Sequence, residues 1–433
     1  MDFQSVIAAR RDNQKQTREQ LELVAKSAAD GTVPDYQLTA WLMAAYLNPL
    51  DPEETAWLTS AMADSGERVD LTGIAKPWVD KHSTGGVGDK TSIVLLPVLA
   101  ACGLTVVKMS GRGLGITGGT VDKLGSIPGF RLDLTPDELK AQAGRIGIAL
   151  TGQTPNLAPA DKTLYALRDA TATVSSIPLI VSSILSKKLA GGAETVVLDV
   201  KCGSGGFMPT LGQATELASA LSETAKRCGL NIRIAISDMN QPLGRAVGNA
   251  LEVKEAMETL QGAPSRFATL CVELAALTLE ASGLQPNREA GRLAATNALG
   301  SGAAAQKAKE WFAAQGATQD VFAHPEVLPL APVIREVEFD GTDCWVSEIK
   351  ANVVGHAVVA LGGGRQRKDS VIDLSVGVEM HVEVGSRVGA GTRLFTVHAA
   401  TESAADLAIS NIRNSISFDS KPTEFVFPIL HTL

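Results

Sequence analysis

The sequence predicts an α/β protein that has a discontinuous all-helical lobe, a larger α/β lobe with a mostly parallel sheet, and a C-terminal β-rich α+β domain. Three observations in the 433 residues predict this architecture. Apolar residues recur at helical spacing over the first 65 residues. From about residue 70, short apolar runs alternate with helical stretches, which favours parallel strands. Beyond residue 330, short strand-like runs predominate.

The helical lobe is expected to combine two segments that are far apart in the sequence, 1–66 and 156–192. In the first segment, Leu21, Val24 and Ala28 repeat at the spacing of one helix face. Helical spacing returns in the second segment, after the chain has passed through several predicted strands. A lobe built in this way leaves a cleft beside the α/β lobe, and clefts between lobes are where substrates commonly bind.

The α/β lobe is expected over 67–155 and 193–330. In its first part, the helix-like run TSIVLLPVLAACG (91–103) precedes the strand-like run LTVVKMS (104–110). In its second part, ETVVLDV (194–200) resumes the sheet and helices follow it. Because parallel strands need a crossover segment between them, this alternation predicts a largely parallel sheet.

The C-terminal domain is expected over 331–433, after the proline-rich run HPEVLPLAPV (324–333). We interpret GHAVVAL (355–361) and RLFTVHA (393–399) as strands, with a polar helix and a short tail after them. The portion VEVGSRVGAGTRLFTV resembles half of a biotinyl or lipoyl carrier domain. No acceptor lysine stands in its exposed turn, so a cofactor-carrier role is not expected.

The composition narrows the function classes. A net charge of -8 and 4% aromatic residues argue against a nucleic-acid surface, which needs a basic face. No apolar run approaches the ~18 residues that cross a membrane, and MDFQSVIAARRDNQKQ lacks the apolar core of a secretory signal. We therefore expect a cytoplasmic protein without a membrane partner. The five cysteines are scattered and form no CxxC pair, so neither disulfides nor a zinc site are expected.

Two glycine-rich stretches each follow a predicted strand and precede a predicted helix: KHSTGGVGDKTS (81–92) and SGRGLGITGGT (110–120). The first is not a nucleoside-triphosphate loop, because Asp89 stands where that motif requires glycine and would repel a phosphate. The second contains GLGITG (113–118), which fits the dinucleotide fingerprint, but the loop is broader than the tight turn of that motif. Either stretch alone is also consistent with a simple strand-to-helix turn.

The two stretches together are more informative than either one. Both present backbone amides and a helix amino terminus at the carboxyl edge of the sheet, where α/β folds bind ligands. Both also carry hydroxyl groups there, namely Ser83 and Ser92 in the first stretch and Ser110 and Thr120 in the second. Lys81 adds a positive charge. We interpret the pair as a site for one small tetrahedral anion.

Four long motifs extend this interpretation: KHSTGGVGDKTS (81–92), KMSGRGLGITGGTVDKLGSIPGF (108–130), TGQTPNLAPADKTLYALRDATATVSSIPLIVSSILSKK (151–188) and ISDMNQPLGRAVGNALEVKEA (236–256). Together they resemble the pyrimidine-nucleoside phosphorylase and thymidine phosphorylase family, and the similarity runs over essentially the whole chain. The resemblance implies reversible phosphorolysis of uridine, thymidine and deoxyuridine to the free base and α-(deoxy)ribose 1-phosphate.

The resemblance also implies the roles of individual residues. The residues that hold the phosphate nucleophile are Lys81, Ser83, Ser92, Lys108, Ser110 and Thr120. The residues at the base are Arg168, Ser183 and Lys187. His82 is expected near the base, where a protonated or hydrogen-bonding imidazole would help the pyrimidine leave, so the catalytic set is His82, Arg168 and Lys187. Asp161 is expected to orient a neighbouring group.

This chain departs from the pattern of the family at Ile116 and Lys90, and Lys108 occupies a position that varies between its branches. Many relatives have histidine where this chain has Ile116. Members that accept ribonucleosides tend to have lysine at the position of Lys108, so broad specificity is favoured over thymidine specificity. No cofactor is required. The resemblance admits a potassium ion on atoms of Gly88, Lys90, Leu243, Ala246 and Glu255, although the Lys90 ammonium could replace it. A homodimer through the N-terminal helices is implied as well.

Three other hypotheses remain open. An anthranilate-type phosphoribosyltransferase has a similar fold and glycine loop, but it needs magnesium and a pyrophosphate site. A dinucleotide oxidoreductase would depend on GLGITG alone. A non-catalytic nucleoside-binding protein would have no use for a phosphate pocket. Phosphate-dependent release of the base, without nicotinamide or magnesium, distinguishes the expected activity from all three.

Overall fold

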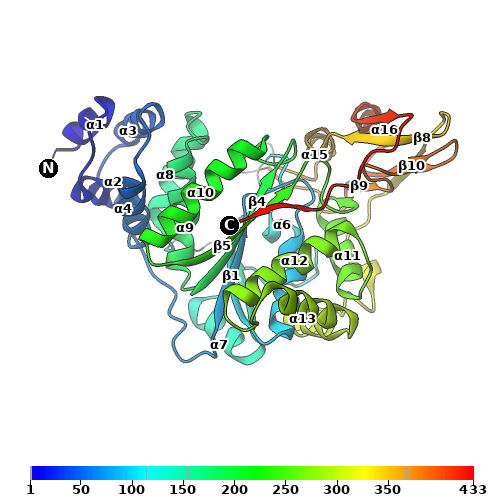
Figure 1. The fold of residues 1–433 in the computed structure, drawn as a ribbon, viewed down its shortest axis with the longest axis horizontal. Coiled ribbons are helices and arrows are strands. Elements are labelled where there is room, and N and C mark those ends of the chain that lie inside the picture. Colours follow the sequence, from blue (N-terminus) through cyan, green and yellow to red (C-terminus); the bar gives the residue numbers. More distant parts are fainter. Residues whose placement is uncertain (1, 114, 153, 155, 366, 368–369) are drawn as a thin grey trace.

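The computed structural model describes residues 2–113, 115–152, 154, 156–365, 367 and 370–433. Figure 1 shows the N-terminal helices at one end, the sheet with its helices in the middle, and the C-terminal strands at the other end. This arrangement confirms the predicted fold class. The predicted domain limit at residue 155 lies outside the described residues. Among the described residues, no helix is long and apolar enough to cross a membrane.

The helical lobe combines helices from two separated parts of the chain. Its helices are α1 (Phe3–Arg11), α2 (Arg18–Asp30), α3 (Asp35–Leu47), α4 (Pro52–Ala63), α8 (Pro159–Ala170) and α9 (Ile177–Ala190). Thr17 and Asp51 begin α2 and α4 with capping boxes, which satisfy amides that would otherwise lack partners. The two segments share one apolar core, in which Trp41 from α3 lies with Leu164 from α8 and Leu179 from α9.

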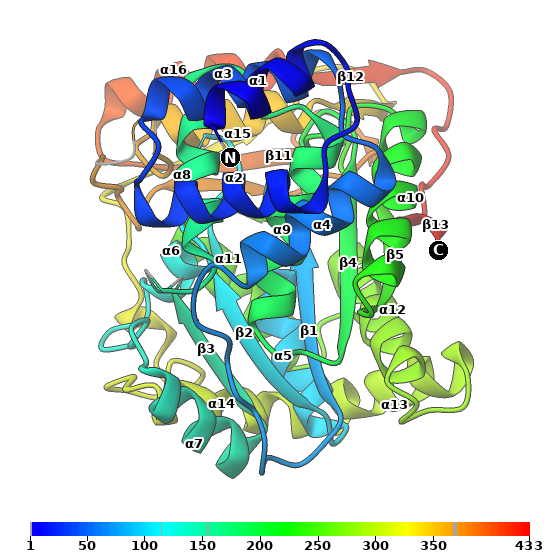
Figure 2. The same cartoon turned by 90° about the vertical axis from the view of Figure 1, so that its left-hand side faces the viewer.

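The central sheet has the strand order β13-β5-β4-β1-β2-β3. Its strands are β1 (Trp78–Ser83), β2 (Thr105–Ser110), β3 (Ile148–Gly152), β4 (Thr195–Cys202), β5 (Asn231–Asp238) and β13 (Ile429–Thr432). The first five are parallel, so their carboxyl ends meet at one edge, as Figure 2 shows for β1 to β4. β13 pairs antiparallel with β5 and returns the chain end to this sheet.

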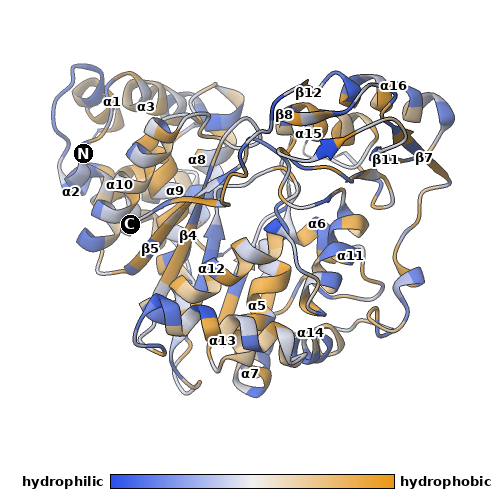
Figure 3. Ribbon diagram, turned by 45° about the vertical axis from the view of Figure 1, so that its right-hand side comes forward, coloured by the Kyte–Doolittle hydropathy of each residue, from blue (hydrophilic) through white to orange (hydrophobic). Residues whose placement is uncertain are grey.

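Apolar side chains cover both faces of the sheet. Val196 and Leu198 of β4 pack on one face with α10, whereas Val197 points to the opposite face with α5 and α12, as the period of two of a strand requires. In Figure 3, β4, β5 and α5 are therefore largely orange, the colour of hydrophobic residues. The helices of this lobe are α5 (Thr91–Ala101), α6 (Thr120–Leu124), α7 (Pro136–Ile146), α10 (Leu211–Arg227), α11 (Asn249–Leu260), α12 (Arg266–Ala281), α13 (Arg288–Gly300) and α14 (Ala303–Ala314).

The described residues of the C-terminal part form two small antiparallel sheets and two α-helices. Its elements are β7 (Val333–Glu338), β8 (Cys344–Ile349), α15 (Ala351–Ala360), β9 (Gly377–Met380), β10 (Arg387–Val388), β11 (Arg393–Ala399), α16 (Glu402–Arg413) and β12 (Ile416–Asp419). A short strand of the α/β lobe, β6 (Ala246–Val247), pairs with β9 and so joins this part to the α/β lobe.

One predicted strand is wrong. The run 355–361 was interpreted as a strand, but residues from Ala351 to Ala360 form helix α15. Val354, Ala357 and Val358 are buried at the spacing of one helix face. Burial on this face outweighs the strand preference of the valines, because β-propensity depends strongly on tertiary context.

Candidate active site

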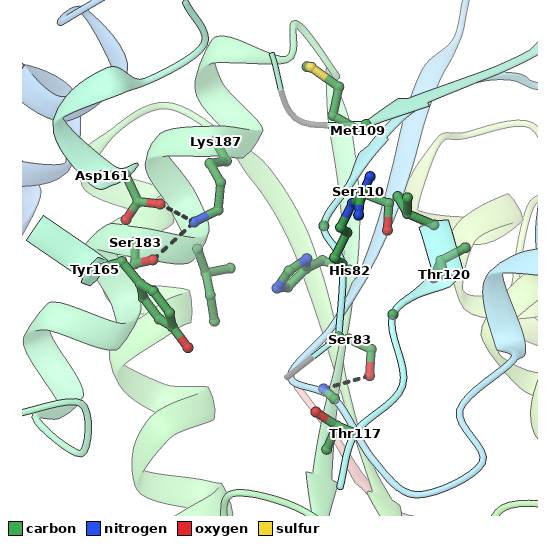
Figure 4. Close-up of a pocket in the computed structure, with 18 of the residues that line it drawn as sticks. His82, Ser83, Met109, Ser110, Thr117, Thr120, Asp161, Tyr165, Ser183 and Lys187 are labelled. Carbon is green, nitrogen blue, oxygen red and sulfur yellow. Dashed lines mark hydrogen bonds and ion pairs between the residues drawn. The ribbon is translucent and has the colours of Figure 1, made fainter. Parts of the chain in front are cut away.

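A cavity of about 1260 Å³ lies between the carboxyl ends of β1 and β2 and the helices α8 and α9. Figure 4 shows its two walls facing each other. One wall consists of the two glycine-rich loops with His82 and Ser83. The other carries Tyr165, Ser183 and Lys187 from the helical lobe. Apart from Lys81, the residues that the sequence assigned to phosphate and to base therefore border one cleft.

The loop wall gathers the predicted hydroxyl groups. Ser83 and Ser110 end β1 and β2, and Ser92 and Thr120 lie at the starts of α5 and α6; all four residues line the cavity. The loop after β2 folds back on itself so closely that a Cβ at Gly113 would lie 2.3 Å from the amide nitrogen of Gly119. No residue larger than glycine fits there. The geometry thus explains the glycines and leaves backbone and hydroxyl groups to face the cavity.

Lys81 occupies a different place from the one expected for a phosphate ligand. Its side chain is fully buried beneath the loop, where the ammonium donates a hydrogen bond to the Thr91 hydroxyl. The Lys81 Nζ lies 3.6 Å from the nearer Asp199 oxygen and 3.9 Å from an Asp89 oxygen. Asp199 also pairs with Lys201 at 2.7 Å. Lys81 does not belong to the described residues that line the cavity.

Lys108 borders the cavity at the end of β2 and is nearly fully buried. Its ammonium donates a hydrogen bond to the carbonyl oxygen of Lys81 and lies 3.6 Å from an Asp80 oxygen. Burial lowers the pKa of Lys108 to about 8, although Asp80 acts in the opposite direction. Lys108 therefore titrates close to neutral pH.

His82 lines the cavity opposite Tyr165 and is half-buried. Burial, together with the charges of Lys188 and Lys108, holds the pKa of His82 well below 6.5. The imidazole is consequently neutral at pH 7. Of the two roles that the resemblance allows, hydrogen bonding fits this environment and proton donation by an imidazolium does not.

The helical wall holds Lys187 between two partners. The Lys187 ammonium pairs with Asp161 and donates a hydrogen bond of 3.0 Å to the Ser183 hydroxyl, as Figure 4 shows. The spacing of four residues between Ser183 and Lys187 places them on one face of α9, as expected. Asp161 thus orients a neighbouring group, and that group is Lys187.

Arg168 joins the end of α8 to the start of α9. Its guanidinium donates hydrogen bonds to the carbonyl oxygens of Leu179 at 3.0 Å and Val174 at 2.7 Å, and it lies 5.7 Å from the centre of the Tyr165 ring. Within the described chain, the buried Nε of Arg168 and Oδ1 of Asp161 have no hydrogen-bond partner. Both atoms are enclosed by protein, so they do not face the cleft directly.

Sequence reasoning missed Tyr165. Its ring is 39% exposed and projects into the cavity on the helical wall. The signal was present, because Asp161, Tyr165 and Arg168 repeat at helical spacing and so share one face of α8. An aromatic ring on that face can cover a planar base.

The oxygen atoms named for a potassium ion lie behind the loop wall, and the Lys90 ammonium contacts them directly. Lys90 Nζ lies 2.7 Å from the Leu243 carbonyl oxygen, 2.8 Å from that of Ala246 and 2.8 Å from a Glu255 oxygen. The Gly88 carbonyl oxygen accepts a hydrogen bond from the backbone amide of Lys90 and not from its ammonium. A potassium ion does not fit these residues while the Lys90 ammonium is in place.

The helical bundle and the α/β lobe both match glycosyl transferase family models, which supports an enzyme of the pentosyl-transferring type. The glycosyl transferase family helical bundle domain matches residues 4–66, the family's a/b domain matches 75–305, and the pyrimidine nucleoside phosphorylase C-terminal domain matches 345–419. The chain belongs to the pyrimidine-nucleoside phosphorylase family.

Full-length relatives support this membership. The chain is 46% identical over 427 residues to a pyrimidine-nucleoside phosphorylase of Geobacillus stearothermophilus, with 98% of each chain covered. It is 44% identical over 418 residues to the protein of the same name from Staphylococcus epidermidis, with 96% of each covered. A solved anthranilate phosphoribosyltransferase from Thermus thermophilus matches with a TM-score of 0.60 and 20% identity, over 72% of this chain and 99% of that one. The last likeness shows the fold alone.

Proposed function

We propose that this enzyme catalyses the reversible phosphorolysis of pyrimidine nucleosides, namely uridine, thymidine and deoxyuridine, to the free base and α-(deoxy)ribose 1-phosphate. The observation that carries this proposal is the pairing of two walls across one cleft. One wall offers hydroxyl groups and loop amides for phosphate, and the other offers Arg168 and Lys187 for a leaving base. The names of the full-length relatives support the same reaction.

The proposed chemistry follows from this arrangement. A phosphate oxygen forms a bond to C1' of the pentose while the bond between C1' and the base nitrogen breaks. The electron pair of the broken bond stays on the pyrimidine, which becomes an anion, and the pentose passes through an oxocarbenium-like state. The hydrogen phosphate loses its proton as it becomes the pentose 1-phosphate, and the pyrimidine anion takes up one proton to give the free base. Lys187 and the Arg168 guanidinium stabilise the charge that develops on the base. Neutral His82 donates a hydrogen bond to it.

The first prediction is that base release requires phosphate. Purified enzyme should release uracil from uridine and thymine from thymidine only when inorganic phosphate is present, and purine nucleosides should be inert. Chromatographic measurement of the free base, without added magnesium or nicotinamide, checks this. Equal release in phosphate-free buffer would indicate a hydrolase, and dependence on magnesium would favour the phosphoribosyltransferase alternative.

We further propose broad specificity toward ribose and deoxyribose, based on Lys108. This lysine is the nearly buried cation at the end of β2 and borders the cavity beside Ser110. A 2'-hydroxyl that enters a closed cleft needs a hydrogen-bond partner, because an unpaired buried polar group costs ~1 to 3 kcal/mol. The Lys108 amine supplies such a donor. Ribonucleosides are then accepted as well as deoxyribonucleosides.

The second prediction tests Lys108 by substitution. Lys108→Met should reduce kcat/KM for uridine by about 5- to 150-fold more than for thymidine, since ~1 to 3 kcal/mol of pairing is lost only with the 2'-hydroxyl. Lys162→Met, which removes an exposed lysine at the rim of the same cavity, controls for the general loss of charge. An equal fractional loss on both nucleosides would contradict the 2'-hydroxyl role.

The same variant has a pH signature. The Lys108 ammonium is present below its pKa of about 8 and is lost as the pH rises through that value. Wild-type kcat/KM for phosphate should therefore fall above pH 8, because the phosphate site loses a positive charge. The Lys108→Met enzyme should lack this fall in kcat/KM above pH 8.

The homodimer and the cytoplasmic location remain predictions.

A further inference from the structure

Lys90 is one of the most deeply buried charged residues, with 1% of its surface exposed. Its ammonium donates hydrogen bonds to the carbonyl oxygens of Leu243 and Ala246 and forms an ion pair with a Glu255 oxygen, and each of these three oxygens lies within 2.8 Å of Nζ. The Phe267 ring closes the site from another side, with its centre 5.0 Å from Lys90 Nζ. A set of oxygens and an aromatic ring around a single positive charge is a cation site.

The backbone is shaped to build this site. A Cβ at Gly88 would lie 2.9 Å from the Leu243 oxygen and 3.1 Å from the Ala246 oxygen, and a Cβ at Gly244 would lie 2.4 Å from a Glu255 oxygen. Both glycines also have positive φ angles, +76° and +73°. The Glu255 carboxylate is fixed in turn by the amides of residues 245 and 246, at 2.8 and 2.7 Å. The cage therefore depends on two positions that exclude side chains.

We propose that the Lys90 ammonium is a built-in monovalent cation that replaces a free ion in this cage and makes the protein independent of potassium. An ammonium group and a potassium ion carry the same charge and favour similar oxygen ligands. A cation on the side chain is present at a high effective concentration, so it needs no ion from solution.

The position of the cage gives it a structural task. Lys90 precedes α5, whose second residue, Ser92, lines the cavity. Ala246 begins β6, which pairs with β9 of the C-terminal part. The Lys90 contacts therefore tie the first glycine-rich loop to the segment that carries the C-terminal part. Loss of the cation leaves Glu255 buried without its charged partner, which is strongly destabilising.

The test compares wild type with Lys90→Ala in sodium, potassium, ammonium and choline chloride. Thermal midpoint and kcat/KM for uridine are measured at equal ionic strength. Wild type should be indifferent to the cation within twofold. Lys90→Ala should have a lower thermal midpoint and at least tenfold lower kcat/KM in choline, and potassium or ammonium should restore at least half of both losses. The thermal midpoint needs no substrate, so this result stands apart from the proposed reaction.

Two further variants sharpen the test. Lys90→Met keeps a side chain of similar length in the cage without the charge, so it should lose stability and show no recovery with any cation. Lys90→Ala combined with Glu255→Gln removes the anionic ligand and should also abolish the recovery. If the Lys90→Ala protein is insoluble, its refolding yield is measured in potassium chloride and in choline chloride, and the yield should be higher in potassium. The proposal is overturned by a wild type that requires potassium, or by a Lys90→Ala protein that responds alike to all four salts.

Discussion

Replacing Lys187 by alanine is expected to lower kcat by roughly 100- to 1000-fold, the usual loss when one donor to a developing anion is removed. Lys187 lies on the helical wall of the cleft, where its ammonium contacts Asp161 and Ser183. In the proposed reaction, its charge acts where negative charge appears on the base. The KM for phosphate should change little, because the groups proposed to bind phosphate lie on the other wall. Steady-state kinetics with each substrate varied in turn measure both parameters.

Lys187→Arg is the matched variant, because it keeps the charge and changes the geometry. It should retain more activity and a higher thermal midpoint than the alanine variant, because arginine keeps a cation beside the buried Asp161 carboxylate and alanine does not. Wild-type kcat in Lys187→Ala at saturating uridine would remove the proposed role.

Arg168→Ala is expected to lower kcat by a similar factor, but it also removes hydrogen bonds to the carbonyls of Leu179 and Val174. Its loss of activity is therefore accompanied by a loss of stability. The comparison with Lys187→Ala separates a base-binding effect from a loosened helix junction.

The sequence was most informative where local pattern and fold agree. The alternation around TSIVLLPVLAACG and LTVVKMS predicted α5 and β2, and both exist within a few residues of those limits. Helix α15 was mistaken for a strand because its valines suit either structure. The terminal strand β13 was not foreseen, because four residues carry little pattern and their pairing with β5 spans nearly 200 positions of the chain.

The candidate site shows the same division. Motifs indicated the hydroxyl groups on the loops and the Ser183 and Lys187 pair, because those positions are defined along the chain. Motifs could not show that Lys81 is buried, because its partner Asp199 comes from a distant segment. Lys90 is different, because the resemblance had already grouped it with Leu243, Ala246 and Glu255, which its ammonium contacts. A partial signal existed: β1 and β4 are central parallel strands, which are normally apolar, and yet each contains an aspartate and a lysine.

Lys81 provides the second large effect, on stability. The Lys81 and Asp199 side chains are fully buried, and Asp89 is nearly so. Removing one partner of a buried ion pair leaves an uncompensated charge and typically costs ~3 to 5 kcal/mol. In Lys81→Met, Lys201 still pairs with Asp199, so the charge that loses its cation is mainly that of Asp89. We therefore expect Lys81→Met, which keeps the apolar stem and removes the ammonium, to lower the free energy of unfolding toward the lower end of that range in phosphate-free buffer.

Urea denaturation without phosphate measures this loss as a shift in the midpoint. Asp89→Asn combined with Lys81→Met should be less destabilising than the sum of the two single changes, because the double variant no longer buries the Asp89 charge without the Lys81 cation. A lysine that served only as a phosphate ligand would behave differently. Its loss would leave phosphate-free stability unchanged and would remove only the extra stability that added phosphate confers. Unchanged midpoints for Lys81→Met in phosphate-free buffer would therefore show that the buried network with Asp89 and Asp199 contributes little, and would return Lys81 to the role of a phosphate ligand alone.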